Sequence, residues 1–378
     1  MKIKAKSPRR RDILLAGVGL ISTMASVVQP VSAQATRTVA TARASKRLEG
    51  RDEPIIDADI AIIDAHHHLF DRPPQTYLLK EYLEDARSGH NIVGSVYIET
   101  QAFNRISGPE IFRPLGEVEF ANGVGAMSAS GAYGDIRVNS SIISHADLRY
   151  GDEIAPYLDA CLAHAPERFK GVRQVTLDDA NEQAFAFVTT RPPSGILQHP
   201  NFKKGLKHLQ ERQLTFDVAV FHHQIPDIIR LADQFPDIVM VLNHMGHIMA
   251  LGLNDTQKHE AFILWRKYLA ELAKRPNIYC KIGGLGLPFW GFGLHERQEP
   301  IGSLELAALW KPYIETAIEC FGPLRSMMES DYPMDGRSCG FVPLWNALKL
   351  NVSGYSIDEK NWLFNKTASN VYKINLDI

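Results

Sequence analysis

The sequence predicts an α/β fold of the (β/α)8 TIM-barrel type, and two observations support this. Eight short apolar runs, rich in β-branched residues, recur between residue 56 and the end of the chain. Amphipathic stretches separate them, such as QIPDIIRLADQF at 224–235, whose apolar residues recur at helical spacing. Apolar strands alternating with helices are typical of a parallel sheet buried on both faces, and eight repeats fit a closed barrel.

The eight runs define the expected strands. In chain order they are IAIID (60–64), IVGSVYIE (92–99), VNSSIIS (138–144), FKGVRQV (169–175), LTFDVAVF (214–221), IVMVLN (238–243), IYCKIGG (278–284) and LRSMMES (324–330). In a barrel, the residues at the carboxyl ends of these strands converge on the active site. An open doubly wound sheet is the alternative, but no GxGxxG motif opens a helix after the first run.

Two connections are unusual in composition or length. The glycine-rich segment GGLGLPFWGFG at 283–293 also carries aromatic residues, which favours a lid or pocket wall over a phosphate-binding loop. The segment from Gln101 to Arg137 is long for a plain connection, and loops of this length are often functional or mobile.

The N-terminal region differs from the rest of the chain. A basic head precedes an apolar stretch of 16 residues, Ile13–Val28, and VSAQA at 31–35 offers small residues for cleavage. PRRRDILLAG at 8–17 resembles a twin-arginine signal, which carries folded proteins to the periplasm. We therefore expect an export signal over residues 1–35, a linker over 36–55 and the barrel over 56–378, with an uncleaved membrane anchor as the alternative.

Composition narrows the class of partner. The 378 residues carry a formal net charge of −2, which gives no electrostatic reason to expect nucleic acid or an anionic membrane. A small-molecule substrate is expected, and a homo-oligomer remains possible. Four scattered cysteines without CxxC spacing favour free thiols, with one disulfide as the alternative.

Three consecutive histidines follow the first run. Because side chains alternate along a strand, His66 and His68 face one side and His67 faces the other. An Asp-x-His-x-His arrangement led by Asp64 suits a divalent metal ion such as zinc, which prefers imidazole ligands and keeps an open position for water. The pattern predicts a site to which His66 and His68 contribute.

Several motifs resemble one family. IIDAHHHLFD (62–71), FDVAVFHHQIPDIIRLADQFPDIVMVLNHMG (216–246) and MMESDYPMD (327–335) look like the amidohydrolase-related group of the amidohydrolase superfamily. The resemblance spans most of residues 56–376. This group contains sugar-lactone and pyrone-dicarboxylate hydrolases and some aromatic-acid decarboxylases.

The resemblance implies roles for individual residues. His66, His68 and Asp331 become candidate metal ligands, and Asp331, His244 and His222 become candidate catalytic residues. A carboxylate such as Asp331 can take a proton from an attacking water and return it to the leaving alkoxide. Asp335 and His223 are the neighbouring alternatives to Asp331 and His222.

Residues at the second, third and fourth strand ends are candidate substrate contacts. They are Glu99, His145 and Arg173, whose guanidinium fork suits a carboxylate or a carbonyl. The end of the fourth run, GVRQVT at 171–176, has no lysine, whereas dinuclear members of the superfamily typically carry a metal-bridging lysine at the end of strand four. We therefore expect one divalent ion, zinc, or none.

These features predict an exported hydrolase that opens a small lactone or cyclic ester, with Asp331 as general base and acid. A metal-dependent decarboxylase of an aromatic or unsaturated acid is the alternative. A non-catalytic barrel is a third possibility, because fold alone does not imply chemistry.

Overall fold

The computed structural model describes residues 53–376, and its eight-stranded parallel sheet confirms the predicted barrel. Each predicted run supplies one strand. The strands, in their order around the sheet, are β1 (Ile62–His67), β4 (Ile92–Ile98), β5 (Arg137–His145), β6 (Phe169–Val175), β7 (Thr215–Ala219), β8 (Met240–Leu242), β9 (Ile278–Ile282) and β10 (Ser326–Met328). Their spatial order is their order along the chain, as expected when each strand is followed by a return connection.

The barrel closes through the segment that follows β10. The backbone N–H of Asp331 donates to the carbonyl of His66 at 2.9 Å, and the N–H of His68 donates to the carbonyl of Tyr332 at 2.8 Å. These bonds join the last strand region to the first at the carboxyl end of the barrel. They place Asp331 beside His66 at the end of β1 and His68 directly after it.

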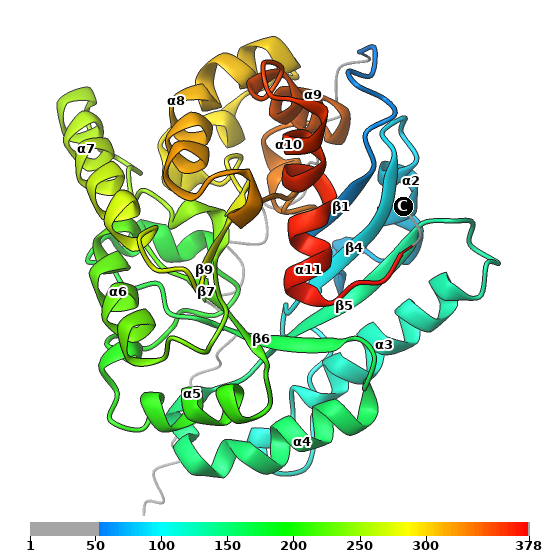
Figure 1. Ribbon diagram of the computed structural model, residues 1–378, viewed down its shortest axis with the longest axis vertical. Coiled ribbons are helices and arrows are strands. Elements are labelled where there is room, and N and C mark those ends of the chain that lie inside the picture. The colour runs from blue at the N-terminus through cyan, green and yellow to red at the C-terminus, as the bar shows by residue number, and fades with distance from the viewer. Residues whose placement is uncertain (1–52, 377–378) are drawn as a thin grey trace, which may run out of the picture. The chain divides into compact units, whose positions relative to one another are not determined.

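Helices surround the strands, as Figure 1 shows. They are α2 (Leu79–Ala86), α3 (Leu115–Ala129), α4 (Ala155–His164), α5 (Phe202–Glu211), α6 (Ile225–Gln234), α7 (Asp255–Leu272), α8 (Ser303–Phe321), α9 (Phe341–Asn351), α10 (Ile357–Asn361) and α11 (Thr367–Tyr372). A short antiparallel hairpin, β2 (Phe70–Arg72) and β3 (Gln75–Tyr77), follows β1. None of the helices in residues 53–376 is long and apolar enough to cross a membrane.

The strands separate two apolar cores. Ile62 and Ile142 pack in the large cluster between sheet and helices, whereas their neighbours Ile63 and Ile143 pack in a smaller cluster inside the barrel. This alternation follows from the two-residue repeat of a strand. Helix α11 contributes Val371 and Tyr372 to the inner cluster.

The segment between Gln101 and Arg137 is not the open loop that its length suggested. It contains the 15-residue helix α3, which is rich in glycine. A Cβ at Gly116 would lie 2.6 Å from the carbonyl oxygen of Phe103, and one at Gly125 would lie 2.7 Å from the Arg168 side chain. The glycines therefore permit close packing, and their composition concealed the helix.

The end of the predicted linker lies against the barrel. The Glu53 carboxylate accepts a hydrogen bond from the Ser303 N–H at 2.8 Å, and Asn346 donates to the carbonyl of Pro54 at 3.0 Å. The predicted export signal at 1–35 and linker residues 36–52 lie outside the described residues. All four cysteines are free thiols, as the sequence analysis expected.

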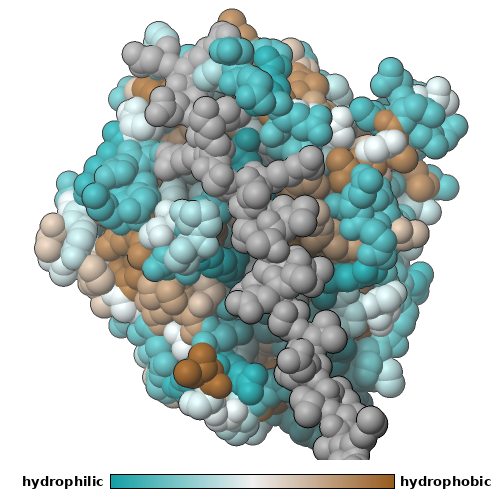
Figure 2. All heavy atoms as spheres, turned by 180° about the vertical axis from the view of Figure 1, so that it is seen from behind, coloured by the Kyte–Doolittle hydropathy of each residue, from teal (hydrophilic) through white to brown (hydrophobic). Residues whose placement is uncertain are grey.

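Large exposed hydrophobic side chains are distributed over separate elements. Ile106 lies in the loop after β4, Leu304 in α8 and Ile357 in α10. Figure 2 shows hydrophilic and hydrophobic residues interspersed over the visible part of one face.

Candidate active site

Two histidines and a carboxylate converge at the carboxyl end of the barrel. His66 Nε2 lies 3.2 Å from His68 Nε2, and the two nitrogens lie 3.6 and 3.3 Å from Asp331 Oδ1. All three residues are buried. Asp331 adopts a positive φ of 52°, a conformation uncommon outside glycine, which turns the chain directly after the eighth run. The structure thus brings together the three predicted metal ligands.

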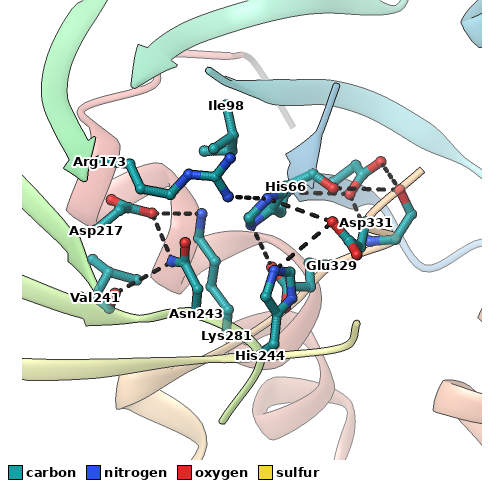
Figure 3. Close-up of polar contacts among 12 residues, drawn as sticks. His66, Ile98, Arg173, Asp217, Val241, Asn243, His244, Lys281, Glu329 and Asp331 are labelled. Carbon is teal, nitrogen blue, oxygen red and sulfur yellow. Dashed lines mark hydrogen bonds and ion pairs between the residues drawn. The ribbon is translucent and has the colours of Figure 1, made fainter. Parts of the chain in front are cut away.

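Glu329 orients the imidazoles of this cluster. Its two carboxylate oxygens lie 3.0 Å from His66 Nδ1 and 2.7 Å from His244 Nδ1 (Figure 3). His244 Nδ1 forms a hydrogen bond with Glu329, whereas the contact of His66 Nδ1 with the other carboxylate oxygen is a close approach without hydrogen-bond geometry. Each Nε2 is directed toward Asp331, at 3.6 and 3.8 Å. The sequence analysis did not include Glu329. Its spacing of two residues from Asp331, which puts both on one face of an extended chain, was the available signal.

The surroundings set the charge of these groups. Burial, followed by the positive charge of Lys281, holds the pKa of His66 well below its usual value, so this imidazole is neutral. Burial opposes protonation of His244, but the carboxylates of Glu329 and Asp331 outweigh it and raise its pKa. Burial would also raise the pKa of Asp331, yet the nearby imidazoles of His244 and His68 lower it. Asp331 is therefore an ionised carboxylate.

Arg173 and Glu99 form a buried ion pair beside the cluster. Arg173 Nε lies 3.0 Å from Glu99 Oε1, and a second guanidinium nitrogen donates to the Glu99 carbonyl at 2.8 Å. Arg173 Nη1 also lies 3.2 Å from His66 Nε2. Burial would raise the pKa of Glu99, but Arg173 lowers it. The predicted residues at the second and fourth strand ends thus meet at the site.

The cluster forms one end of a cavity. Its polar wall is made by His68, Arg72, Glu99, Thr100, Gln101, Arg173, Thr189, Thr190, His244, His247 and Asp331. Its apolar wall is made by Phe70, Val175, Leu177, Phe187, Val188, Ala219, Leu287, Phe289 and Met334. Leu287 and Phe289 belong to the glycine-rich segment, so its predicted role as a pocket wall is confirmed.

Three predicted site residues, His66, His145 and His222, are not among the described residues that line this cavity, although His66 belongs to the cluster behind its wall. β7 ends at Ala219, and the chain leaves the sheet before His222, whose Nδ1 accepts a hydrogen bond from the Met249 N–H at 3.2 Å. Burial lowers the pKa of His222 to about 4. His145 ends β5, half-buried, and its positive charge would lower the pKa of Glu99. The roles assigned to His145 and His222 stay predictions without geometric support.

His247 and His67 show how orientation separates the histidines. His247, which the sequence analysis missed, lines the cavity and stacks on His244 with ring centroids 4.8 Å apart. The spacing NHMGH was the available signal. His67 instead bonds to Ser95 Oγ at 2.9 Å and packs on Tyr82 of α2, with burial lowering its pKa to about 3. It faces the helices, as predicted.

The donor set fits a single divalent cation. One ligand atom from each of His66, His68 and Asp331 lies within 4.8 Å of the others, and Asp331 Oδ2 has no hydrogen-bond partner among the described residues. Imidazole nitrogen and carboxylate oxygen are the ligand types that zinc prefers. Asp335, the alternative acid, is not part of this donor set; its Oδ2 accepts a hydrogen bond from the Gly286 N–H at 2.9 Å.

Comparison with known proteins agrees with this fold and identifies the family. The model of the amidohydrolase family matches residues 63–374, so the chain belongs to the amidohydrolase family. It is an enzyme of that family. An uncharacterized protein, y4mH, from Sinorhizobium fredii is 30% identical over 84% of this chain and 100% of its own length. An L-fucono-1,5-lactonase from Burkholderia multivorans is 26% identical over 62% of this chain and 72% of its own.

A solved structure shows the same fold. The crystal structure of an amidohydrolase from Burkholderia multivorans with bound zinc superposes with a TM-score of 0.62 and 22% identity. The match covers 83% of this chain and 100% of that chain.

Proposed function

We propose that the protein is an exported hydrolase that opens a small lactone or cyclic ester by water attack. The observation that carries the proposal is the buried, ionised Asp331 at the wall of a cavity, with one oxygen that has no hydrogen-bond partner within residues 53–376. Such a carboxylate is suited to accept a proton from water. The relatives named as L-fucono-1,5-lactonases support the choice of a lactone.

The residues of the site can carry out the ring opening of a lactone by water. Asp331 accepts a proton from a water as the water oxygen forms a bond to the lactone carbonyl carbon. Arg173 and His244, which takes a proton more readily than an ordinary histidine, stabilise the resulting oxyanion. When the ring C–O bond breaks, Asp331 returns the proton to the leaving alkoxide, which yields a hydroxy acid.

We also propose that the site holds one divalent cation, zinc. His66, His68 and Asp331 would be its ligands, and Glu329 would orient the His66 imidazole through Nδ1. When bound, such an ion polarises a carbonyl oxygen and lowers the pKa of bound water. Because β6 carries Arg173 at the site and no lysine within GVRQV, a bridged pair of metals is not expected.

Export belongs to the same proposal and has its own test. The twin-arginine-like segment at 8–17 and the small residues near Ala33 motivate it. Mass spectrometry of the periplasmic protein should find an N-terminus after Ala33 or Ala35. A protein that stays in the cytoplasm with Met1 intact would overturn this part.

The reaction class is tested by following acid and gas together. A panel of sugar and aromatic lactones is incubated with the zinc-loaded protein in a pH-stat, and carbon dioxide is measured in parallel. One equivalent of acid per ring opened, without gas, is expected. Carbon dioxide release from aromatic acids, in proportion to added metal, would instead establish the decarboxylase alternative.

A further inference from the structure

Arg72 lies on the wall of the cavity, away from the strand ends that carry the chemistry. It ends β2 of the hairpin that follows β1 and is half-buried. Its guanidinium lies 5.3 Å from the ring centroid of Phe70. It donates to Thr189 Oγ1 at 3.1 Å and to the carbonyl oxygen of Thr100, so it connects the hairpin to the loop after β6.

Both hydrogen-bond acceptors of Arg72 are neutral groups. Among residues 53–376, no carboxylate forms an ion pair with its guanidinium within 4.0 Å. Burial lowers its pKa, and the more distant charges of Glu117 and Glu99 act in the opposite direction. Arg72 is therefore a half-buried cation without a paired anion, and a guanidinium has five N–H donors with which to bind one.

The two carboxylates whose charges act on Arg72 already have partners of their own. Glu117 accepts hydrogen bonds from Tyr97 at 2.8 Å, from the Thr100 N–H at 2.8 Å and from the Gln101 N–H at 3.1 Å. Glu99 is paired with Arg173. The two cavity arginines consequently differ: Arg173 is paired with Glu99, whereas Arg72 has no paired carboxylate among the described residues.

We propose that Arg72 determines specificity by binding a carboxylate substituent on the substrate. This inference rests on the proposed function and deepens it. The apolar wall, which includes Leu177, Phe187 and Phe289, offers few partners for the hydroxyl groups of a sugar ring. The substrate is thus a lactone with one largely apolar face and an anionic group directed toward Arg72. Burying that group is favourable only where a cation receives it.

The test compares a carboxylate with its neutral counterpart. The probes are coumarin-3-carboxylate and coumarin-3-carboxamide, two fluorescent lactones that differ only in this substituent. Their dissociation constants are measured by fluorescence titration on Asp331→Asn protein, which removes turnover, with and without Arg72→Met. The Arg72→Met change should weaken carboxylate binding about 10- to 100-fold and leave carboxamide binding within about twofold.

Two further variants separate recognition from structure. Arg72→Lys keeps the charge but not the planar fork, so it should restore part of the carboxylate preference. Arg191→Met is the matched control, because Arg191 lies in the same loop as Thr189 but is exposed and paired with Glu182. Melting temperatures show which variants are folded, and Arg72→Lys carries the test if Arg72→Met is unstable.

The outcomes distinguish this inference from the function on which it rests. Equal weakening of both probes, or of neither, would overturn the role of Arg72 even if lactones are hydrolysed. An Arg72-dependent preference for the carboxylate supports it even if the wild type opens no lactone, in which case the proposed hydrolysis alone fails.

Discussion

Two charged groups of residues lie close together inside the barrel and have opposite properties (Figure 3). In the first, the interior ion pair, Lys281 Nζ lies 2.8 Å from Asp217 Oδ2, and both side chains are fully buried. Tyr372 and Asn243 donate hydrogen bonds of 2.9 and 3.0 Å to the Asp217 carboxylate. Neither residue is among those that line the cavity. The neighbours hydrogen-bond to the Asp217 carboxylate, whereas Lys281 Nζ has its ion pair and no hydrogen-bond partner among the described residues.

The second group, the histidine–carboxylate cluster, consists of His66, His68, His244, Glu329 and Asp331. Its Nε2 nitrogens and an Asp331 oxygen face one another at the cavity wall, and Asp331 Oδ2 has no partner among the described residues. Buried charges that pair with one another stabilise the fold, whereas charged groups that face a cavity can act on a ligand. The difference predicts which substitutions affect folding and which affect chemistry.

Breaking the interior ion pair should have the largest effect on stability. Lys281→Met leaves Asp217 as a buried carboxylate without its cation, which should lower the free energy of unfolding by about 3–5 kcal/mol. Urea unfolding followed by circular dichroism measures this, with the exposed Lys80→Met as control. An unchanged unfolding midpoint would show that the pair contributes nothing.

The histidine–carboxylate cluster should bind an added cation. At free zinc of about 100 times Kd, the wild type should gain about 2.7 kcal/mol of stability, visible as a higher melting temperature. His68→Asn should remove most of this gain, whereas His259→Asn, an exposed residue of α7, should retain it. The metal proposal fails if zinc stabilises neither wild type nor control.

Loss of the carboxylate that orients the imidazoles should have an intermediate effect. Glu329→Gln removes the negative charge that lies against the Nδ1 atoms of both His66 and His244, so zinc affinity and turnover should fall about 10- to 100-fold. Competition titration with a chromophoric chelator measures the affinity. Glu260→Gln, an exposed acid on α7, is the control, and equal affinities in the two variants would exclude this role.

The smallest effect should come from crowding His244 without changing its chemistry. Gly284 has a φ of +61°, and a Cβ there would lie 2.2 Å from His244 Nδ1. Gly284→Ala should therefore cost about 1–2 kcal/mol of stability and reduce turnover. Gly354→Ala, where nothing lies within 4 Å, should change neither. Full activity of the Gly284 variant would show that His244 tolerates displacement.

The sequence was sufficient to predict the barrel and much of the cluster. The two-residue repeat of strands separated His66 and His68 from His67, and barrel topology brought His244 and Asp331 to the same end. Glu329 was missed because its role depends on imidazoles from β1 and from the turn after β8, which only the folded chain brings near. Arg72 was missed because it follows the strand end, in a hairpin whose path the pattern does not predict.

Other differences arose from local packing. His222 was chosen because the fifth run continues in sequence to Phe221, but β7 ends at Ala219. His247, which the sequence analysis did not consider, lines the cavity. The helix α3 was hidden by glycines that serve close packing. In each case tertiary contacts, and not the periodicity of the segment itself, decided the outcome.

The central claim is that Asp331 moves the proton during lactone opening. The most direct measurement is the rate of ring opening by wild type, Asp331→Asn and the exposed control Asp237→Asn, all loaded with zinc and checked for equal melting behaviour. We expect Asp331→Asn to lose about 10²- to 10⁴-fold in kcat and the control to lose nothing. Turnover by Asp331→Asn within about twofold of wild type would contradict the account.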